Sequence, residues 1–341
     1  MISIFYYFGL KIFVHIKNRV IAGAFDKFIS QTILNPDMSL IRKPCSARDI
    51  NVSIGFKDSR APVRGVFSES IGLQLPDNKS IFTPCRFFEG PQAGVYYNIF
   101  SGIAVIRVSE NADLIDVVFF TKASLEKYSD VIFRYIFSFI LEGNGFSFVH
   151  ASGVAKGGKA VIFPAAAGGG KSTIAMALLL SGFEWIGDEH AVFKLRRGRT
   201  VDISPSLFAL TAGLRREALS KFSRLQGYKD GFASLAKKNK TKMFLSIKPD
   251  FLITHAQLKA TVFPRITDER KSRIKKIRAK ETAECLLASA YKERFYHHGG
   301  MFLKDRYQAL LGLASKADNY RMYLGTDSQA WAGIISSVIN R

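Results

Sequence analysis

A glycine-rich loop between an apolar strand and an apolar helix is the feature that most constrains this chain. The loop runs from Ala165 to Thr173 and reads AAAGGGKST. The run Lys159–Phe163 before it predicts a buried strand, and the apolar run from Thr173 to Gly182 predicts a helix with a glycine stop. Glycines let several backbone N–H groups point at one spot, and the helix adds its positive N-terminal end. The stretch predicts a phosphate-binding loop, with a plain glycine-rich turn as the alternative.

All but one position of the loop fits a nucleoside triphosphate and its metal ion. The common pattern is G-x-x-x-x-G-K-[S/T], and Ala165 stands where that pattern has its first glycine. In this pattern the lysine reaches the β- and γ-phosphates and the hydroxyl ligates Mg²⁺, so we assign these roles to Lys171 and Ser172. The residues expected to hold ATP and Mg²⁺ are Ala165, Gly168, Gly169, Gly170, Lys171, Ser172 and Thr173.

A predicted β-hairpin brings a histidine to the mouth of this loop. The apolar runs 148–155 and 159–163 flank Gly157-Gly158, a dipeptide typical of hairpin turns. In that register His150 faces Ala165. A lone histidine on a strand is often only a packed side chain, so a structural role for His150 stays open beside the functional one.

Two carboxylates follow the next predicted strand. Residues 183–187 read FEWIG and predict a strand, and Asp188 and Glu189 follow it directly. An enzyme with a phosphate-binding loop needs an Mg²⁺ ligand and a group that takes the acceptor's proton at about this point of the chain. The alternative is a solvated turn.

At these residues the chain resembles the HPr kinase/phosphorylase family. The resemblance extends to related serine kinases and peptide-modifying kinases, and to the phosphoenolpyruvate carboxykinase-type nucleotide fold. The family has a histidine strand, the loop, a short helix and a paired acidic motif after an apolar strand. His150, Gly170-Lys171-Ser172 and Asp188-Glu189 fall into this pattern without a gap, and the close match spans His150 to His190.

The resemblance implies an α/β fold and ATP-dependent phosphorylation of a hydroxyl. It assigns the general base to Asp188, help with metal or substrate to Glu189, and tuning of proton traffic or phosphate charge to His150. Asp188 and Glu189 join Ser172 as the expected metal ligands. Related kinases often carry a strand ending in F-P-R, so Arg265 is a candidate to clamp triphosphate or acceptor.

One family signature is missing. The glycine-rich segment of type E-x-R-G-x-G, which true HPr kinases carry after the acidic pair, is absent. HPr itself is therefore not the expected substrate, and phosphorylase activity is not expected either.

The chain of 341 residues, 48% of them hydrophobic, suits two domains. We expect an N-terminal β-rich region over 1–145 that ends in a buried helix, and an HPr-kinase-like catalytic domain over 146–341. Ser124 is expected to cap the buried helix, which ends at Gly143. The strands predicted before this helix are 52–56, 95–100, 103–108 and 114–120.

The segments after the acidic pair are less regular. Strands are predicted at 191–195 and 200–203, and Pro205 is expected to open a helical stretch over 207–225. Residues 226–243 are rich in Gly and Lys and predict a loop. Further strands are expected at 251–255 and, in a central place, at 259–265, and residues 279–341 are expected to be mainly helical.

Net charge is +21, and it is concentrated in one region. Residues 215–281 hold nineteen Lys or Arg against six Asp or Glu. Such a surplus favours an anionic partner: a nucleotide, an acidic peptide, nucleic acid or lipid. No nucleic-acid-binding motif accompanies the charge, so nucleic acid is not the expected partner. A solvated basic face is the alternative.

The start of the chain and the cysteines bear on location. The apolar run of residues 2–10 is too short to span a bilayer, so residues 1–20 are expected to be a packed helix or strand, with an amphipathic membrane anchor as the alternative. The three cysteines Cys45, Cys85 and Cys285 predict neither disulfides nor zinc. We expect a cytoplasmic protein, with peripheral membrane contact as the alternative.

Together these features predict an ATP-dependent phosphotransferase. The acceptor is expected to be a serine hydroxyl of a protein, a peptide or free serine, and homo-oligomers are common among related kinases. The alternatives are an ATP-binding regulatory module that docks to an anionic partner or membrane surface, and a nucleic-acid-dependent ATPase.

Overall fold

The chain is a mixed α/β protein. The computed structural model describes residues 2–7, 10–30, 48–56, 85–89, 95–100, 104–109, 113–166, 168–196, 200–205, 209–215, 242–292 and 303–341. The chain divides into two compact units, the first from Met1 to Gly145 and the second from Phe146 to His297 and from Lys304 to Arg341.

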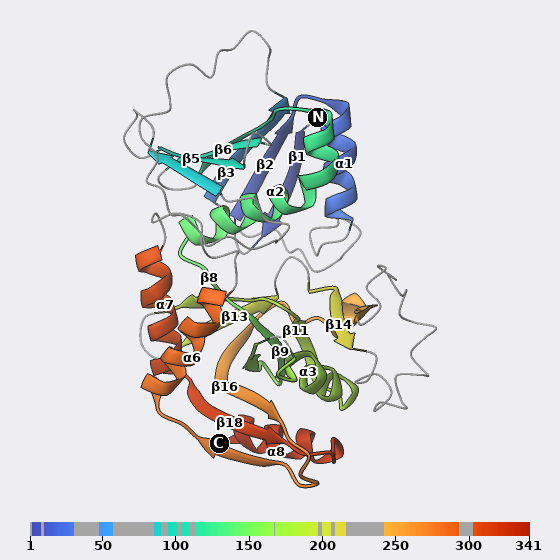
Figure 1. Ribbon diagram of the computed structural model, residues 1–341, viewed down its shortest axis with the longest axis vertical. Helices are drawn as coiled ribbons and strands as arrows, with labels where there is room; N and C mark the ends of the chain where they lie inside the picture. Colours follow the sequence, from blue (N-terminus) through green and yellow to red (C-terminus); the bar gives the residue numbers. More distant parts are fainter. Residues whose placement is uncertain are drawn as a thin grey trace. The chain divides into compact units, whose positions relative to one another are not determined.

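The first unit is built on a seven-stranded mixed sheet of order β1-β2-β3-β7-β6-β5-β4. Strands β2, β3 and β7 are parallel neighbours, and the other pairs are antiparallel. Helices α1 and α2 contact each other and pack against the sheet (Figure 1). The elements are β1 (Ile2–Tyr7), β2 (Leu10–Ile16), α1 (Arg19–Ile29), β3 (Arg48–Phe56), β4 (Cys85–Glu89), β5 (Val95–Phe100), β6 (Ala104–Ser109), β7 (Leu114–Phe119) and α2 (Lys122–Gly143).

Phenylalanines join the two helices of this unit. The ring of Phe133 on α2 lies 5.1 Å from that of Phe25 and 5.2 Å from that of Phe28, both on α1. Phe119 of β7 meets Phe133 edge-on, at 6.3 Å between centroids. Phe25, Phe119 and Phe133 are almost fully buried. The apolar run predicted in α2 is therefore confirmed as a buried one.

Residues 2–7 and 10–20 include two strands and the start of a helix. β1 and β2 pair as an antiparallel hairpin, and the side chain of Asn18 caps α1 by accepting a hydrogen bond from the Val20 N–H at 2.8 Å. The side chains of β2 at Ile12, Val14 and Ile16 are buried. The prediction of a packed first element is confirmed. Across the described ranges, no helix has the length and apolarity needed to cross a membrane.

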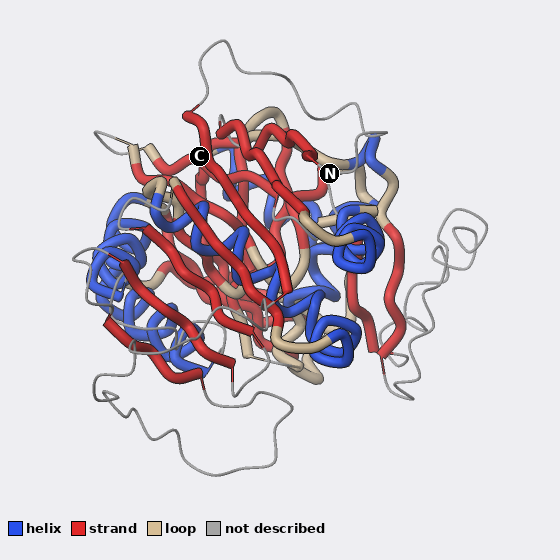
Figure 2. The backbone as a smooth tube through the Cα atoms, turned by 90° about the horizontal axis from the view of Figure 1, so that it is seen from above, coloured by secondary structure: helices blue, strands red, loops and turns tan. Residues whose placement is uncertain are grey.

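The second unit is built on a nine-stranded mixed sheet whose main path is β11-β9-β10-β16-β13-β12-β8. β18 pairs with β16, and β17 pairs with β18. Figure 2 distinguishes these strands (red) from the helices (blue). The strands are β8 (Ser147–Val149), β9 (Ala151–Lys156), β10 (Lys159–Pro164), β11 (Glu184–Gly187), β12 (Ala191–Leu195), β13 (Val201–Pro205), β16 (Ala256–Ile266), β17 (Arg273–Lys276) and β18 (Asp318–Leu324).

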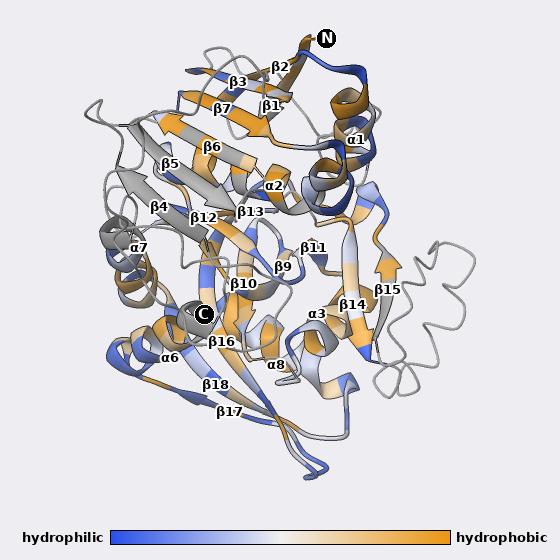
Figure 3. Ribbon diagram, turned by 45° about the horizontal axis from the view of Figure 1, so that its top comes forward, coloured by the Kyte–Doolittle hydropathy of each residue, from blue (hydrophilic) through white to orange (hydrophobic). Residues whose placement is uncertain are grey.

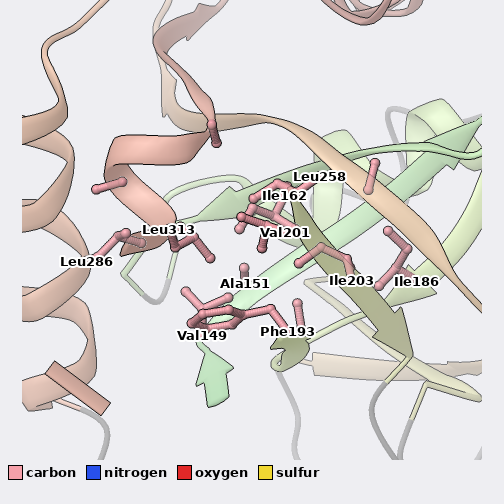
Figure 4. Close-up of a cluster of buried hydrophobic side chains, with 14 of the residues drawn as sticks. Val149, Ala151, Ile162, Ile186, Phe193, Val201, Ile203, Leu258, Leu286 and Leu313 are labelled. Carbon is pink, nitrogen blue, oxygen red and sulfur yellow. The ribbon is translucent and has the colours of Figure 1, made fainter. Parts of the chain in front are cut away.

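Helices cover this sheet. α6 and α7 contribute Leu286, Leu310 and Leu313 to a buried cluster with Ile162 of β10 and Leu258 of β16 (Figure 4). α3 and α8 contact each other and also β10 and β16. Residues 160–164 of β10 are all buried, so both faces of that strand are covered. The helices are α3 (Lys171–Leu180), the short η1 (Pro249–Phe251), α6 (Ala279–Lys292), α7 (Leu303–Lys316) and α8 (Gln329–Asn340).

Three parallel strands carry the glycine-rich loop and its neighbours to one edge of the sheet. β10 is parallel to β16, and β16 is parallel to β18. Because the carboxyl ends of parallel strands meet at one edge, the loop after β10 lies beside the ends of β16 and β18. The hairpin of β9 and β10 has the predicted register, because Pro164 pairs with Ala151. His150 precedes Ala151 and Ala165 follows Pro164, so these two residues are opposite each other just beyond the last pair.

Several expected elements differ from those observed. The capping residue of α2 is Thr121, whose hydroxyl accepts a hydrogen bond from the Ser124 N–H, so the assignment of the cap to Ser124 is wrong. The helix expected over 207–225 is contradicted where the chain is described, because β14 (Thr211–Arg215) pairs there with β15 (Lys242–Ser246). The Gly- and Lys-rich segment 226–243 is expected to be a loop, and its residues 226–241 lie outside the described part of the chain.

Two further differences lie near the C-terminus. Residues 251–255 do not form a strand, because the chain makes a short helical turn at η1 and a single bridge from Leu252 to Trp185. The helical C-terminal region contains β18, which the sequence analysis missed. The central place predicted for residues 259–265 is confirmed, since β16 pairs with β10, β13 and β18.

Replacing Phe133 with Ala is expected to destabilise the first unit by about 3–5 kcal/mol, because it opens a cavity at the centre of the aromatic cluster. Urea unfolding followed by circular dichroism would measure it. Replacing Leu114 with Ala is the control, because that side chain is 44% exposed, and its expected cost is within about 0.5 kcal/mol. Equal costs for the two variants would contradict the placement of Phe133 at the core.

Candidate functional site

The glycine-rich loop leads directly into α3. Gly168 and Gly170 have φ angles of +86° and +95°, a left-handed conformation that favours glycine. Gly170 is the N-cap of α3 and no side chain caps the helix, whose first intrahelical bond runs from Ile174 N–H to the Gly170 carbonyl at 2.9 Å. The first N–H groups of α3 therefore have no partner within the helix, which is the arrangement that attracts an anion.

Ala165 is accommodated by a glycine further along the loop. A Cβ atom on Gly169 would lie 2.9 Å from the Cβ of Ala165 and 3.2 Å from the Ala166 carbonyl oxygen. The methyl group of Ala165, which replaces the first glycine of the motif, thus occupies space that a side chain at residue 169 would need. The loop tolerates Ala165 because residue 169 has no side chain.

Lys171, the lysine of the motif, is directed toward the acidic pair. Its side chain is buried, and its Nζ lies 3.3 Å from Oε2 of Glu189. Nε2 of His150 lies 3.5 Å from the same oxygen. The buried His150 also meets the ring of His190 edge-on, at 5.9 Å between centroids. The structure thus brings His150, Lys171 and Glu189 together, although the sequence separates them widely.

Asp188 is held by three hydrogen bonds from three segments. Oδ1 accepts from the hydroxyl of Ser172 at 2.8 Å and also from the hydroxyl of Ser152 on β9. Oδ2 accepts from the backbone N–H of Gly213 on β14 at 2.9 Å. Asp188 is only 3% exposed. Ser152 and Gly213 are site residues that the sequence analysis missed, because nothing in their local sequence marks them.

The turn after β11 orients the two carboxylates differently. Glu189 has a φ of +71°, the one positive φ found among the described non-glycine residues, and such backbone strain is more often kept at functional positions. β11 before it is anchored by the buried Trp185, whose indole N–H donates to the Ala209 carbonyl at 2.7 Å. The turn directs Asp188 into the protein, while the Glu189 side chain is 38% exposed.

A second cation lies beside the loop. A Cβ atom on Gly168 would be 3.2 Å from a terminal nitrogen of the Arg215 guanidinium. Arg215 ends β14, is exposed, and makes no ion pair within the described part of the chain. β14 therefore supplies both the Gly213 N–H that holds Asp188 and a guanidinium at the loop. In the sequence, Arg215 is marked only as part of a basic region, because a helix is expected here.

Arg265 lies elsewhere than expected. Ile266, its neighbour on β16, lies against the loop, since a Cβ atom on Gly170 would be 3.1 Å from the Ile266 side chain. Successive side chains of a strand point to opposite faces, so Arg265 faces away from Gly170. Arg265 is exposed, and among the described residues no hydrogen bond or ion pair joins it to the loop. Thr173, the last residue of the motif, is half-buried in the first turn of α3.

The oxygen donors at the site suit Mg²⁺. The Ser172 hydroxyl and the Asp188 carboxylate already touch, and hard oxygen ligands of this kind are those that Mg²⁺ prefers. Among the described residues, no cluster of three or more His, Cys, Asp or Glu is placed to form a cage for a metal ion. A magnesium ion held here by Ser172 and Asp188 would take its remaining ligands from water and phosphate oxygens, as is usual for nucleotide-bound Mg²⁺.

Comparison with solved structures finds distant matches to this chain. No family model and no curated protein matches the chain. Among solved structures, the chain is similar to the HPr(Ser) kinase/phosphatase from Coxiella burnetii, with a TM-score of 0.28 and 9% identity, over 57% of this chain and 93% of that one. This is only a distant, fold-level resemblance.

Replacing Gly169 with Ala is expected to lower the free energy of unfolding of the second unit by about 1–3 kcal/mol, because the new methyl group meets Ala165 and the Ala166 carbonyl. Tryptophan fluorescence would follow this unit, since both tryptophans lie in it. The double variant Ala165→Gly/Gly169→Ala should recover part of the loss. A double variant no more stable than Gly169→Ala would show that Ala165 does not restrict residue 169.

Proposed function

We propose that this protein is an ATP-dependent phosphotransferase that moves the γ-phosphate of ATP to an acceptor hydroxyl. The observation that carries the proposal is the meeting of Lys171 and Ser172, at the uncapped start of α3, with Asp188 and Glu189 at the end of β11. Phosphoryl transfer needs positioning and charge stabilisation more than covalent chemistry, and these four side chains supply both.

The hydrogen bonds favour Asp188 as the metal-holding carboxylate. Its two oxygens accept three hydrogen bonds, one of them from Ser172, and its burial leaves little room for an acceptor hydroxyl. Paired with a loop serine, this carboxylate matches the position that holds Mg²⁺ in nucleotide hydrolases. An Mg²⁺ ion held by Asp188 and Ser172 would offset the negative charge of the phosphates.

Glu189 then becomes the proton acceptor. Sequence resemblance assigned that role to Asp188, but Glu189 is the more exposed carboxylate and lies within 3.5 Å of both Lys171 and His150. In the proposed step the acceptor oxygen attacks the γ-phosphorus, while the bond between the γ-phosphorus and the β,γ-bridging oxygen breaks. ADP leaves with the bond's electron pair, and the hydroxyl proton passes to Glu189.

Two cations would stabilise the transferred phosphoryl group. Lys171 sits at the position that reaches the β- and γ-phosphates. Arg215 presents its guanidinium at Gly168, on the loop itself, and a guanidinium can bind two phosphate oxygens at once. Arg215 therefore takes the clamping role that the sequence analysis gave to Arg265.

The acceptor remains defined only by class. The proposed acceptors are a serine of a protein, a serine of a peptide, or free serine, and the missing E-x-R-G-x-G segment disfavours HPr. Incubating the protein with γ-labelled ATP and Mg²⁺ and with lysate pools of protein, peptide and small molecules tests the proposal. Label transfer that is absent in Lys171→Ala would support it. ATP binding without transfer would favour the regulatory module, and no ATP binding would refute both.

Kinetics of the two variants should distinguish the roles of the two carboxylates. Glu189→Gln is expected to lower turnover about 10²–10⁴-fold while Mg·ATP affinity stays near that of the wild type, because only a proton acceptor is lost. Asp188→Asn is expected to weaken Mg²⁺-dependent ATP binding as well as turnover. Titration with a fluorescent ATP analogue, with and without Mg²⁺, would measure the affinities.

Ser172→Ala provides a second variant in case Asp188→Asn is unstable. It removes one hydroxyl from a half-buried position and should reproduce the loss of Mg²⁺-dependent affinity. One combined result would assign the proton-accepting role to Asp188 instead. Mg·ATP affinity would be normal in both Asp188→Asn and Ser172→Ala, while turnover would be lost in Asp188→Asn and retained in Glu189→Gln.

Replacing Arg215 with Ala is expected to lower ATP affinity about tenfold, because it removes one charge-assisted contact to phosphate. ADP affinity should fall less, since the guanidinium would contact the terminal phosphate. Calorimetric titration with both nucleotides would measure this. Arg278→Ala is the matched control, because Arg278 is equally an exposed arginine of the second unit. Identical affinities for Arg215→Ala and wild type would exclude the contact.

A further inference from the structure

A basic surface extends from the end of β16 across β17. Residues 265–280 hold eight Lys or Arg against two Asp or Glu. Figure 3 shows hydrophilic colour along β17 and the turn that precedes it. The eight basic residues, here called the β17 surface, are Arg265, Arg270, Lys271, Arg273, Lys275, Lys276, Arg278 and Lys280.

Strand register places three of these cations on one face of the sheet. Arg265 pairs with Tyr323 of β18, which pairs with Arg273 of β17, so these three side chains point the same way. Lys275 lies two residues after Arg273 and shares that face. The guanidinium of Arg273 lies 4.6 Å from the centre of the Tyr323 ring.

Most of this charge is not neutralised within the protein. Lys276 donates a hydrogen bond to Asp318 at 3.0 Å, which raises its pKa, and Arg273 pairs with Glu269 at 3.0 Å. The other six side chains are all exposed, and none forms an ion pair within the described ranges. They are Arg265, Arg270, Lys271, Lys275, Arg278 and Lys280. Six unpaired cations so close together repel one another, and an anionic partner would relieve that repulsion.

The β17 surface begins at the edge of the sheet beside the candidate phosphate site, although Arg265 and Arg273 lie on the sheet face opposite to Gly170. Ile266 and Leu324 lie against Gly170, at 3.1 Å from a Cβ built there, and Arg265 and Tyr323 immediately precede them on β16 and β18. Because β17 is antiparallel to β18, Arg273 is the end of β17 nearest the loop and Lys276 is the far end. A partner lying along β17 would therefore have one end close to the phosphates.

β17 also has an open edge. Among the described strands it pairs only with β18, so the backbone groups on its other side have no strand to bond. An extended polypeptide can add to such an edge through main-chain hydrogen bonds, and a nucleic acid cannot. Single-stranded nucleic acids need exposed aromatic rings for stacking, and on this face Tyr323 is already engaged by Arg273.

We propose that the β17 surface docks an acidic, extended segment of the polypeptide that carries the acceptor hydroxyl. This inference rests on the proposed function and narrows its acceptor to a protein or peptide with Asp- or Glu-rich sequence near the modified residue. Charge complementarity selects the segment, and the edge of β17 aligns it, so that a neighbouring hydroxyl lies near Glu189 and the γ-phosphate.

A binding experiment tests the proposal without knowledge of the natural acceptor. The probe is a fluorescein-labelled oligoglutamate peptide, followed by anisotropy at physiological salt. The surface variant is Lys271→Gln/Lys275→Gln/Lys280→Gln. The matched control is Lys127→Gln/Lys156→Gln/Lys248→Gln, which removes the same charge from exposed lysines outside the surface. The surface variant should bind roughly tenfold more weakly than the wild type, and the control should change little.

Competing probes identify what would overturn the proposal. Equal losses in both triple variants would show only a general charge effect, and no loss in either would show a solvated face. Tighter binding of single-stranded DNA or of phosphatidylserine vesicles, lost in the surface variant, would assign the surface to nucleic acid or lipid instead.

ATP affinity of the same variants separates this inference from the proposed function. The surface variant should retain the ATP affinity of the wild type, because none of its three lysines contacts the phosphate loop. Surface-dependent binding of the peptide by a wild-type protein that binds no ATP would keep the polypeptide site and refute the kinase proposal. ATP binding and label transfer without any surface-dependent peptide binding would support the kinase proposal and refute the polypeptide site.

Discussion

The buried carboxylate of Asp188 connects the parts of the second unit that meet at the loop. It accepts hydrogen bonds from Ser152 on β9, Ser172 on α3 and Gly213 on β14, so one side chain joins three segments distant in sequence. A buried charge without such donors would be strongly destabilising. The donors therefore fix the turn after β11, and with it the position of Glu189 beside Lys171 and His150.

The same contact gives β14 a part in the site. β14 pairs only with β15 in the described sheets, so the Gly213 hydrogen bond is one of the contacts that hold this two-stranded ribbon near α3. Arg215, two residues further, reaches Gly168 as a result.

Local patterns predicted the elements that depend on local chemistry. The Gly157-Gly158 turn, with both φ angles positive, gives the β9–β10 hairpin its register, and the glycines at 168 and 170 adopt the left-handed backbone that a phosphate loop needs. Residues 211–215, the part of the expected helix 207–225 that forms a described element, are a strand instead, because pairing with β15, about thirty residues later, overrides their helical propensity. Nothing in the local sequence reports a partner that distant.

The sequence by itself determined that a loop of this composition precedes a helix, that Lys171 and Ser172 begin that helix, and that two carboxylates follow the next strand. These are consequences of backbone preference and hydrophobic period, which act over a few residues. Only the tertiary structure decided which carboxylate is buried, which arginine lies at the loop and which faces away. Those outcomes depend on strand pairing and on the turn after β11, because the alternation of side chains and the burial of charge are settled by neighbours from other parts of the chain.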